Sequence, residues 1–417
     1  MKDSVGSILQ IPFDLEIGEL HDFAELQDFW HSPSTVSWFR ERGYMYTPSI
    51  DDNLKSKAPS GDLHEVDYPY AMYDCSGIMP QGALDISGKV LFAQDSCDRH
   101  VAIKIVRTNT DEHRVLRFLN EQSLDTLKAN CLIPVLDFLP NGSYVFVVMP
   151  RWGSSIHLPW ITKAREILEI MHSMLKALAF LHKNNIAHGD INDRNVLVNH
   201  FSDSIALNKN WIRANLRSKG MLSYAVFDFD FSVMLPPEAD RKVYRLPYQR
   251  SWGTFNYTMD TAQGEFDYNP FILDVGILGV RFCSDYQHLT GEIPMLAPLL
   301  DKMTTRNLDH RFTASGALDF FQELYSQLTE EELERYAQTQ FRERHLRYYE
   351  YDRWKHVPVE FAQKWAAYRE PPIPWKTKVL RAICKKSWMS HIVPWIRWVF
   401  SGLWATVRYP FSLDFSR

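Results

Sequence analysis

Asp190 and Asn195 are the residues of this chain whose types and spacing most directly suggest chemistry. They lie five positions apart in His188-Gly-Asp-Ile-Asn-Asp-Arg-Asn-Val-Leu-Val198, which ends in a short apolar run expected to form a strand. A carboxylate on a rigid loop can accept a proton from an attacking hydroxyl, and an amide oxygen can hold a hard metal ion. Alone, this spacing is modest evidence, because surface loops produce such strings by chance.

Four further segments flank this loop. In chain order they are Val101-Ala-Ile-Lys104, Val226-Phe-Asp-Phe-Asp230, Asp274-Val-Gly-Ile-Leu-Gly279 and Leu308-Asp-His-Arg-Phe-Thr313. With the loop they resemble, in the same order, the V-A-I-K strand, the H-R-D-x-x-x-x-N catalytic loop, the D-F-G segment and two C-lobe motifs of protein kinases. The resemblance extends from Gly88 to about Leu328. Five partial motifs in the right order are stronger evidence than any one of them.

The resemblance implies a role for each charged residue of these motifs. Asp190 is expected to be the base that accepts the hydroxyl proton, and Asn195 and Asp228 are expected to hold magnesium. Lys104 is expected to contact the α- and β-phosphates of ATP. Arg194 stands where tyrosine kinases have an arginine in D-x-A-A-R-N, and its guanidinium can neutralise charge on the phosphoryl group.

The resemblance also implies a nucleotide pocket beneath the first strands. Its expected residues are Gly88, Val90, Ala102, Lys104, Glu112, Met149 and Arg151. Glu112 lies in the first turn of a predicted helix and is the expected partner of Lys104, with Glu121 as a competitor. Met149 is the expected gatekeeper before the hinge Pro150-Arg-Trp-Gly153.

Several positions depart from the kinase pattern. The earlier glycines of the Gly-rich loop are missing, and Asp85 near the triphosphate is expected to repel it and weaken nucleotide binding. Gly189 replaces the arginine that binds a phosphorylated activation segment, which predicts a site that is not switched in that way. Asn192 replaces the lysine that contacts the γ-phosphate. Asp230 replaces the D-F-G glycine and is either a second metal ligand or a capped turn residue.

The activation segment is expected over residues 236–256. Its candidate phosphate acceptors are Tyr244, Tyr248, Ser251 and Thr254. Where kinases have A-P-E, this chain has Met259-Asp-Thr261, so the glutamate that pairs with Arg311 in that family is absent. Either Glu265 or Asp267 replaces it, or Arg311 is solvated.

The resemblance implies a strand-rich lobe above a helical one, which together position these residues. Alternating apolar residues predict strands within 84–106 and 132–149, and a Met/Leu stripe predicts an amphipathic helix over 164–182 that delivers the catalytic loop. We therefore predict an α+β, two-lobed protein-kinase-like fold. The predicted parts are an N-terminal extension packed on the N-lobe (1–75), the N-lobe (76–150), the C-lobe (151–330) and a helical, basic, Trp-rich tail (331–417). The stretch 199–224 contains an insertion, expected to be a polar surface loop.

The amino-acid composition indicates which classes of partner and which cellular compartment to expect. The chain has 417 residues, a net charge of −5 and five cysteines without C-x-x-C pairing. The charge gives no indication of a nucleic-acid partner. The cysteines argue against a disulfide framework or a zinc site and favour a reducing, cytoplasmic compartment, and the N-terminus lacks the pattern of a signal peptide.

The C-terminal tail has an unusual composition. From Pro371 to Leu413 there are seven basic residues, five of the chain's 13 Trp and no acidic residue. The first expectation is that these tryptophans pack against the C-lobe or a partner protein. The second is contact with an anionic membrane surface, since a cationic, Trp-rich amphipathic segment suits that interface. A membrane span over 388–407 is disfavoured because Arg397 would lie near its centre.

The functional expectation is a protein kinase that uses ATP and Mg²⁺ to phosphorylate a protein hydroxyl, with serine or threonine favoured. The first alternative is a catalytically silent, kinase-like scaffold, supported by the degraded Gly-rich loop and the lost A-P-E motif. A small-molecule phosphotransferase is the second, because H-G-D also occurs in aminoglycoside-type enzymes. The segment 274–279 and the activation segment argue against it. The overall pattern also resembles the orphan kinase-like proteins that are numerous in fungi.

Overall fold

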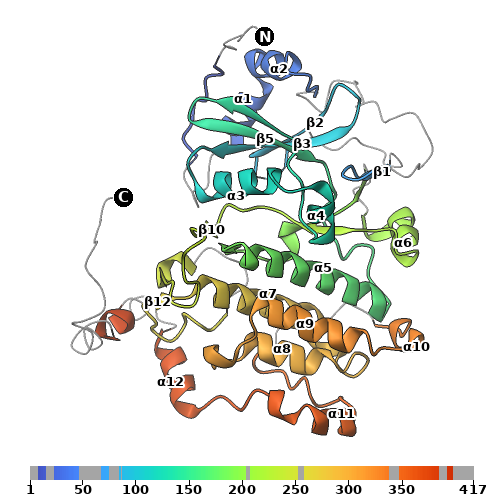
Figure 1. Ribbon diagram of the computed structural model, residues 1–417, viewed down its shortest axis with the longest axis vertical. Helices are drawn as coiled ribbons and strands as arrows, with labels where there is room; N and C mark the ends of the chain where they lie inside the picture. The colour runs from blue at the N-terminus through green and yellow to red at the C-terminus, as the bar shows by residue number, and fades with distance from the viewer. Residues whose placement is uncertain are drawn as a thin grey trace.

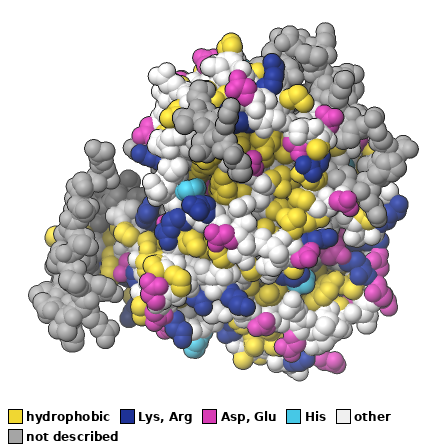
Figure 2. All heavy atoms as spheres, turned by 45° about the horizontal axis from the view of Figure 1, so that its top comes forward, with side chains coloured by type: hydrophobic (Ala, Val, Ile, Leu, Met, Phe, Trp, Pro, Cys, Tyr) yellow, Lys and Arg dark blue, Asp and Glu magenta, His cyan; other side chains and the backbone are white. Residues whose placement is uncertain are grey.

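The structure is a computed structural model. The residues that it describes are 8–15, 23–46, 67–74, 84–85, 87–202, 207–251, 258–337, 347–384 and 392–397. The chain folds into two lobes, a smaller upper lobe that contains the main sheet and a larger helical lobe beneath it (Figure 1). This arrangement confirms the predicted α+β, two-lobed class. On the face drawn in Figure 2, acidic and basic side chains are interspersed, and neither sign covers a continuous area.

A four-stranded antiparallel sheet forms the centre of the upper lobe. Its strands lie in the order β2 (Val90–Gln94), β3 (His100–Arg107), β5 (Tyr144–Pro150) and β4 (Asp137–Asn141). Side chains alternate between the two faces of a strand. On β3, Val101, Ile103 and Ile105 belong to the core above the sheet, whereas Lys104 reaches acidic residues on its other face. A slip of one residue in the register would turn Lys104 away from them.

Helices from the N-terminal extension cover the upper face of this sheet. They are α1 (Phe23–His31) and α2 (Pro33–Arg40). Trp30 and Phe39 have no exposed surface, and their rings lie 5.8 and 4.9 Å from the ring of Phe146 on β5. The indole of Trp30 also donates a hydrogen bond to the carbonyl of Gly88 at 2.8 Å. The extension is therefore part of the upper core, and it holds the turn that enters β2.

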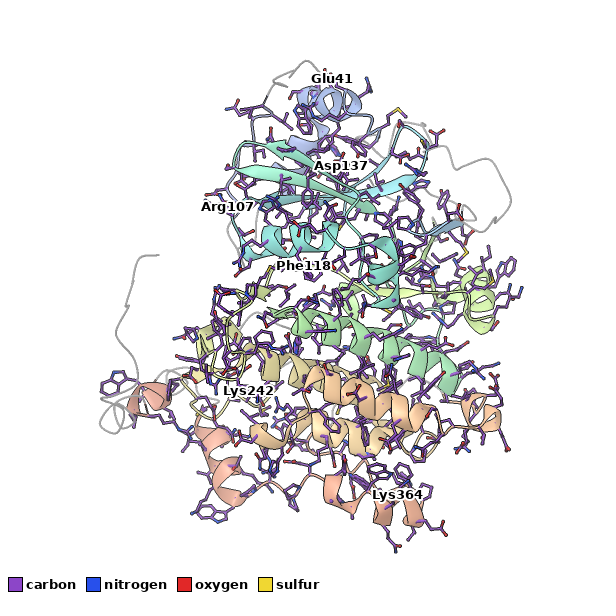
Figure 3. All side chains as sticks on the ribbon, viewed as in Figure 1. Glu41, Arg107, Phe118, Asp137, Lys242 and Lys364 are labelled. Carbon is purple, nitrogen blue, oxygen red and sulfur yellow. The ribbon has the colours of Figure 1, made fainter. Side chains whose placement is uncertain are left out.

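The lower face of the sheet meets the helical lobe through α3 (Asp111–Asn120) and α4 (Leu124–Ala129). Phe118 of α3 points down toward the lower lobe in Figure 3, and its ring lies 6.2 Å from that of Phe180 on the helix below. This contact helps to hold α3 close to the lower lobe.

The helical lobe is built around one long, buried helix. Its helices are α5 (Ala164–Lys183), α7 (Pro270–Tyr286), α8 (Leu296–Thr304), α9 (Ala314–Tyr325) and α10 (Glu330–Leu333). The predicted Met/Leu stripe of α5 is buried, including Ile167, Met171 and Leu178. Short strands frame the loops that follow α5: β6 (Ile186–Ala187), β7 (Val196–Val198), β9 (Tyr224–Val226) and β10 (Val233–Met234). Because β7 pairs with β9, the chain after Asn195 lies beside the chain before Phe227.

The composition of the insertion after β7 predicted a polar surface loop, and this prediction is wrong. Its described part contains α6 (Trp211–Ser218), and two arginines on that helix, Arg213 and Arg217, are almost completely buried. Arg213 donates to the carbonyls of Ser154 and His200, and Arg217 donates to that of Pro159. The guanidinium groups thus satisfy backbone carbonyls of the segment after the hinge. The polar residues of this insertion therefore have a structural role that its composition did not predict.

Two strands link this insertion to the N-terminal half of the chain. They are β1 (Met72–Asp74) and β8 (His200–Ser202), which pair in parallel. The carboxylate of Asp74 accepts hydrogen bonds from Ser202 and Asn210.

The described part of the tail runs along the lower lobe (Figure 1). It contains α11 (Val359–Lys364), α12 (Trp375–Cys384) and a helical segment over 392–397. Asp301 of α8 anchors its start, because its carboxylate pairs with Arg353 and accepts a hydrogen bond from the indole of Trp354 at 2.7 Å. Within the described ranges, no helix has the length and apolar composition needed to cross a bilayer.

Candidate active site

Lys104 is the centre of a buried ionic cluster between the lobes. Its ammonium nitrogen lies 2.6 Å from Glu112, 2.6 Å from Asp228 and 2.5 Å from Asp230. Burial opposes the charge on this amine, but the three carboxylates hold the pKa of Lys104 well above its usual value. One lysine therefore joins strand β3, helix α3 and the segment after β9.

Glu112 reaches Lys104 because of where α3 begins. Thr110 caps this helix through a hydrogen bond from the backbone N–H of His113 to its side chain, which puts Glu112 in the first turn. Glu121, the competitor in the sequence, is the C-cap at the other end of the helix. Burial and the neighbouring Asp230 raise the pKa of Glu112 well above its usual value. The lysine–glutamate pair in this structure is thus Lys104–Glu112.

The segment after β9 delivers two acids to the cluster. Asp228 has a left-handed backbone conformation, with φ of 66°. Between the two acids, Phe229 is buried and lies 5.4 Å from the ring of His188. Carboxylate oxygens of Glu112, Asp228 and Asp230 lie within 4.8 Å of one another. Oxygen ligands at this spacing suit a divalent cation such as Mg²⁺.

Asp230, which occupies the D-F-G glycine position, points into this cluster. Besides Lys104, it contacts the ammonium group of Lys89 at 3.5 Å. Burial acts to raise its pKa, but the two lysines lower the pKa of Asp230 below its usual value. Lys104 on β3 and Lys89, which lies just before β2, therefore converge on one carboxylate.

Asp190 and Asn195 face each other within the catalytic-type loop. The side-chain N–H₂ of Asn195 donates to the backbone carbonyl of Asp190 at 2.8 Å and to its Oδ2 at 3.0 Å. The other oxygen of Asp190, Oδ1, is buried and has no hydrogen-bond partner among the described residues. Burial raises the pKa of Asp190 to about 7, against the opposing effect of Asn195. A buried acceptor without a partner is ready to receive a proton from a hydroxyl.

A buried acid on α7 fixes the start of this loop. Asp274 has no exposed surface, and it accepts hydrogen bonds from the backbone N–H groups of His188 and Gly189 at 2.7 and 2.8 Å. His182, at the end of α5, lies 2.9 Å from the same carboxylate. The segment 274–279 thus acts on the site by holding backbone rather than by touching a substrate.

Gly189 explains the missing arginine of the H-R-D pattern. Its φ is +81°, and a Cβ atom added there would lie 2.3 Å from the carbonyl oxygen of Phe231. A side chain does not fit at this position. The phosphate-reading arginine is therefore sterically excluded by this local backbone, and not merely substituted.

Asn192 and Arg194 occupy the turn between Asp190 and Asn195. Asn192 is buried, donates to the carbonyl of Asp190 at 2.9 Å and accepts from the backbone N–H of Arg194 at 2.9 Å. It shapes the turn and does not replace the missing lysine. The side chain of Arg194 is exposed on the surface of the same turn.

The remaining residues of the predicted nucleotide pocket lie on the adjoining strands. Strand pairing sets Ala102 opposite Met149, and Val90 opposite Lys104. Arg151 is buried, and its guanidinium carbon lies 4.2 Å from the centre of the Phe92 ring. Because aromatic contacts already engage that group, its contact with a nucleotide stays a prediction.

The turn before β2 differs from the expected Gly-rich loop. The carboxylate of Asp85 accepts from the backbone N–H groups of Ser87 and Val90 at 3.1 and 3.0 Å. Gly88 has φ of +70° and is held by Trp30. Self-capping by an Asp side chain is typical of tight turns. The carboxylate of Asp85 therefore closes the turn, and its expected repulsion of a triphosphate stays a prediction.

Lys89 is the residue that sequence reasoning missed. Strand alternation assigns it to the face of Leu91, which belongs to the core above the sheet. The residue lies before the first residue of β2, where the turn breaks the alternation, and its side chain reaches Asp230. A lysine next to the last loop glycine was the only signal in the sequence.

The expected partners of Arg311 were also wrong. Arg311 is bound through two nitrogens by Asp260, at 2.5 and 2.8 Å, and their side chains are 1% and 8% exposed. Asp260 is the middle residue of the triplet that replaces A-P-E. Glu265 instead accepts from the backbone N–H of Gln263. Asp267 lies in β12 (Asp267–Tyr268), paired with β11 (Leu246–Pro247).

Comparison with known proteins agrees with this geometry. Residues 86–260 match the protein kinase domain family. The chain is 31% identical over 114 residues to the serine/threonine-protein kinase PrkC of Bacillus subtilis, which covers 25% of this chain and 18% of PrkC. It is 26% identical over 181 residues to the serine/threonine-protein kinase PknD of Chlamydia felis, which covers 39% of this chain and 19% of PknD. The US3 homolog of varicella-zoster virus, another serine/threonine-protein kinase, is 31% identical over 110 residues, 25% of this chain and 26% of that protein.

The fold, the ordered motifs and the domain match define a protein kinase domain. This domain match, together with the serine/threonine-protein kinase relatives, supports a protein kinase-like superfamily for the chain. It spans about a quarter or less of the length of these curated relatives.

Proposed function

We propose that this chain is an ATP- and Mg²⁺-dependent protein kinase that transfers the γ-phosphate to a protein hydroxyl. The observation that carries the proposal is the simultaneous engagement of Lys104 by Glu112 and Asp228, together with an Asp190 whose Oδ1 has no hydrogen-bond partner among the described residues. Phosphoryl transfer needs positioning and charge neutralisation more than covalent chemistry. These residues supply both.

The donor set fits a magnesium ion bound with ATP. Asp228 and Asn195 would hold the ion: the carboxylate of Asp228 lies in the acidic cluster, and the N–H₂ of Asn195 is used on Asp190, which leaves its amide oxygen for a metal. When bound, the ion neutralises charge on the phosphates. Lys104 would bind the α- and β-phosphates, and Asp190 would orient the substrate hydroxyl and accept its proton at Oδ1.

Serine or threonine is the favoured acceptor. The relatives above are named serine/threonine-protein kinases. Arg194 is the one feature that resembles tyrosine kinases, and it is exposed on the turn between Asp190 and Asn195. An assay with separate serine, threonine and tyrosine peptides distinguishes the two specificities.

A catalytically silent scaffold is the second candidate. The observation that favours it is the closed turn before β2, where the carboxylate of Asp85 already accepts from backbone N–H groups, the kind of donor that a Gly-rich loop presents to phosphates. A scaffold of this kind binds partners without turning over ATP.

Transfer of labelled γ-phosphate to protein and peptide substrates, with and without Mg²⁺, tests the proposal. We expect Mg²⁺-dependent transfer by the wild-type chain and its loss in Asp190→Asn. Nucleotide binding measured in parallel shows whether the variant site still binds ATP. If the wild-type chain binds nucleotide but transfers no phosphate to any acceptor, the scaffold is correct and the kinase proposal is wrong.

A further inference from the structure

Helix α12 packs against the lower lobe with its apolar side turned outward. Trp375, Val379 and Ile383 recur every four residues, and their side chains are 70%, 50% and 37% exposed. Residues at this spacing form one stripe along a helix. Arg381, on the inner side, is only 8% exposed. An amphipathic helix of a soluble domain normally buries the stripe and exposes the charge, so this orientation is inverted.

The helical segment over 392–397 repeats this arrangement. Its outward side chains are Ile392, Trp395 and Ile396, all exposed. Its inner side is attached to the lower lobe, because Val393 packs against Gly264 and Arg397 lies 3.6 Å from Glu265. Two short helices thus present tryptophan and aliphatic side chains while their other sides contact the protein.

The stretch of sequence that contains these two helices carries charge of one sign. From Pro371 to Leu413 the chain has no acidic residue, while the whole chain has a net charge of −5. The basic residues of this stretch are Lys376, Lys378, Arg381, Lys385, Lys386, Arg397 and Arg408. Lys376 and Lys378 are exposed on α12, beside the apolar stripe. Exposed apolar side chains flanked by cations are complementary to a surface that is apolar below and anionic above.

The space beneath α12 also matters for its role. A cavity of about 1230 Å³ is lined by Arg381 and Ala382 of α12 and by Thr261 and Gly264 of the segment that follows the activation segment. The helix therefore contributes little to the tightly packed core. Changes on its outer side are not expected to disturb the fold.

We propose that the outward faces of α12 and of residues 392–397 form an interfacial anchor that binds anionic lipid membranes. Trp and aliphatic residues enter the boundary between headgroups and acyl chains, and lysines and arginines bind the anionic headgroups. Charge complementarity selects this occupant over a neutral apolar partner. The anchor does not depend on catalysis, and it goes beyond the proposed phosphotransfer.

Vesicle co-sedimentation of the full chain tests the anchor. The vesicles are phosphatidylcholine alone, or phosphatidylcholine with about one third phosphatidylserine, at low and high salt. We expect sedimentation with the anionic vesicles at low salt and its loss with neutral vesicles or high salt. The variant Trp375→Ser/Val379→Ser/Ile383→Ser should weaken partitioning by about a thousandfold, since each of the three buried apolar side chains contributes about tenfold. Lys376→Gln/Lys378→Gln should weaken it about fivefold per charge.

A matched control uses exposed apolar residues elsewhere. Trp211→Ser/Val359→Ser removes two side chains that are 72% and 70% exposed, on α6 and α11, and should leave vesicle binding unchanged. The melting temperature of every variant verifies the fold. If the wild-type chain stays in the supernatant with anionic vesicles at low salt, the membrane proposal is wrong. Self-association in light scattering that the triple variant abolishes would assign the face to a second copy of the chain instead, and binding that the control weakens equally would show nonspecific adsorption.

Discussion

Two ion-pair sites in this molecule have opposite designs. At the lobe interface, Lys104 is surrounded by three carboxylates, and Asp228 and Asp230 are 32% and 24% exposed. Beneath the activation segment, Arg311 and Asp260 form a one-to-one, two-pronged pair that is almost completely buried. The cluster around Lys104 has more carboxylates than lysines and is partly accessible to solvent. The Arg311–Asp260 pair is balanced in charge and closed to solvent.

The difference shows how the same interaction serves chemistry or structure. In a buried, matched pair each charge has its opposite charge, so breaking the pair leaves a buried, unpaired charge and destabilises the fold. A cluster with more carboxylates than lysines can exchange partners, because each lysine keeps an acid when one of them turns to a ligand. We therefore expect changes at Lys104 to remove activity and changes at Arg311 to remove stability.

The largest expected effect is on phosphotransfer. Lys104→Met and Asp228→Ala should each lower Mg²⁺-dependent transfer by about a thousandfold, because each removes a group that acts on developing charge. The fold should remain intact, since the remaining acids can take up protons. Labelled-phosphate assays and thermal melting measure the two effects, with Lys219→Met, an exposed lysine after α6, as control. Equal activity in wild type and variants would refute the assigned roles.

The opposite expectation holds at the buried pair. Arg311→Gln should lower the free energy of unfolding by about 3–5 kcal/mol, because Asp260 is left charged without its partner. The double variant Arg311→Gln/Asp260→Asn should lose less than the sum of the single changes. Urea unfolding followed by circular dichroism measures this, and nucleotide binding by the remaining folded protein should change little. Additive losses would mean that the two residues do not act as a pair.

Changes at Lys89 test whether the second lysine of the cluster around Lys104 contributes to nucleotide binding. Lys89→Met should weaken ATP binding about tenfold, the typical worth of one hydrogen bond to a charged group, because it removes the second cation beside Asp230. Lys89→Arg should retain most of the affinity. Titration with a fluorescent ATP analogue measures both. If Lys89→Met binds ATP as tightly as wild type, its contact with Asp230 is only structural.

The protonation of Asp190 should have opposite effects on activity and on stability. The pKa of Asp190 is raised to about 7, so a base at this position loses activity about tenfold for each pH unit below 7. A carboxyl whose folded-state pKa is raised above its unfolded value stabilises the fold below the unfolded pKa and loses that contribution as pH rises through 7. Asp190→Asn should therefore melt at a higher temperature than wild type at pH 8 and at a similar one at pH 4. A flat pH–activity profile from 6 to 8 would contradict a base at Asp190.

The smallest effect is expected in the activation segment. Replacing Tyr244 and Tyr248 by Phe, and Ser251 and Thr254 by Ala, removes the candidate phosphorylation sites and should change activity less than about twofold. The reason is that Gly189 has no side chain that could bind a phosphate on the activation segment. Ser251 is buried and bonds the carbonyl of Tyr248, so its replacement is first examined for stability. A large loss of activity that Glu substitutions restore would show that a phosphate is read elsewhere.

Local patterns predicted what depends on neighbours in the chain. Alternation along β3 predicted a strand with Lys104 on it, and helical spacing predicted the buried stripe of α5. Thr110 and the acids after it predicted the start of α3, and from it the pairing of Glu112 with Lys104. These features follow from periodicity and capping, which act over a few residues.

Other features depend on which distant segments of the chain come into contact. The sequence did not predict these contacts. The polar insertion became a helix whose arginines satisfy backbone carbonyls after the hinge, and Asp260, not Glu265 or Asp267, received Arg311. Residue type alone determined that charges were present, whereas the tertiary structure decided their partners. The physical reason is that an ion pair is selected by geometry and burial across 50 or more residues of chain, and neither quantity is written in local spacing.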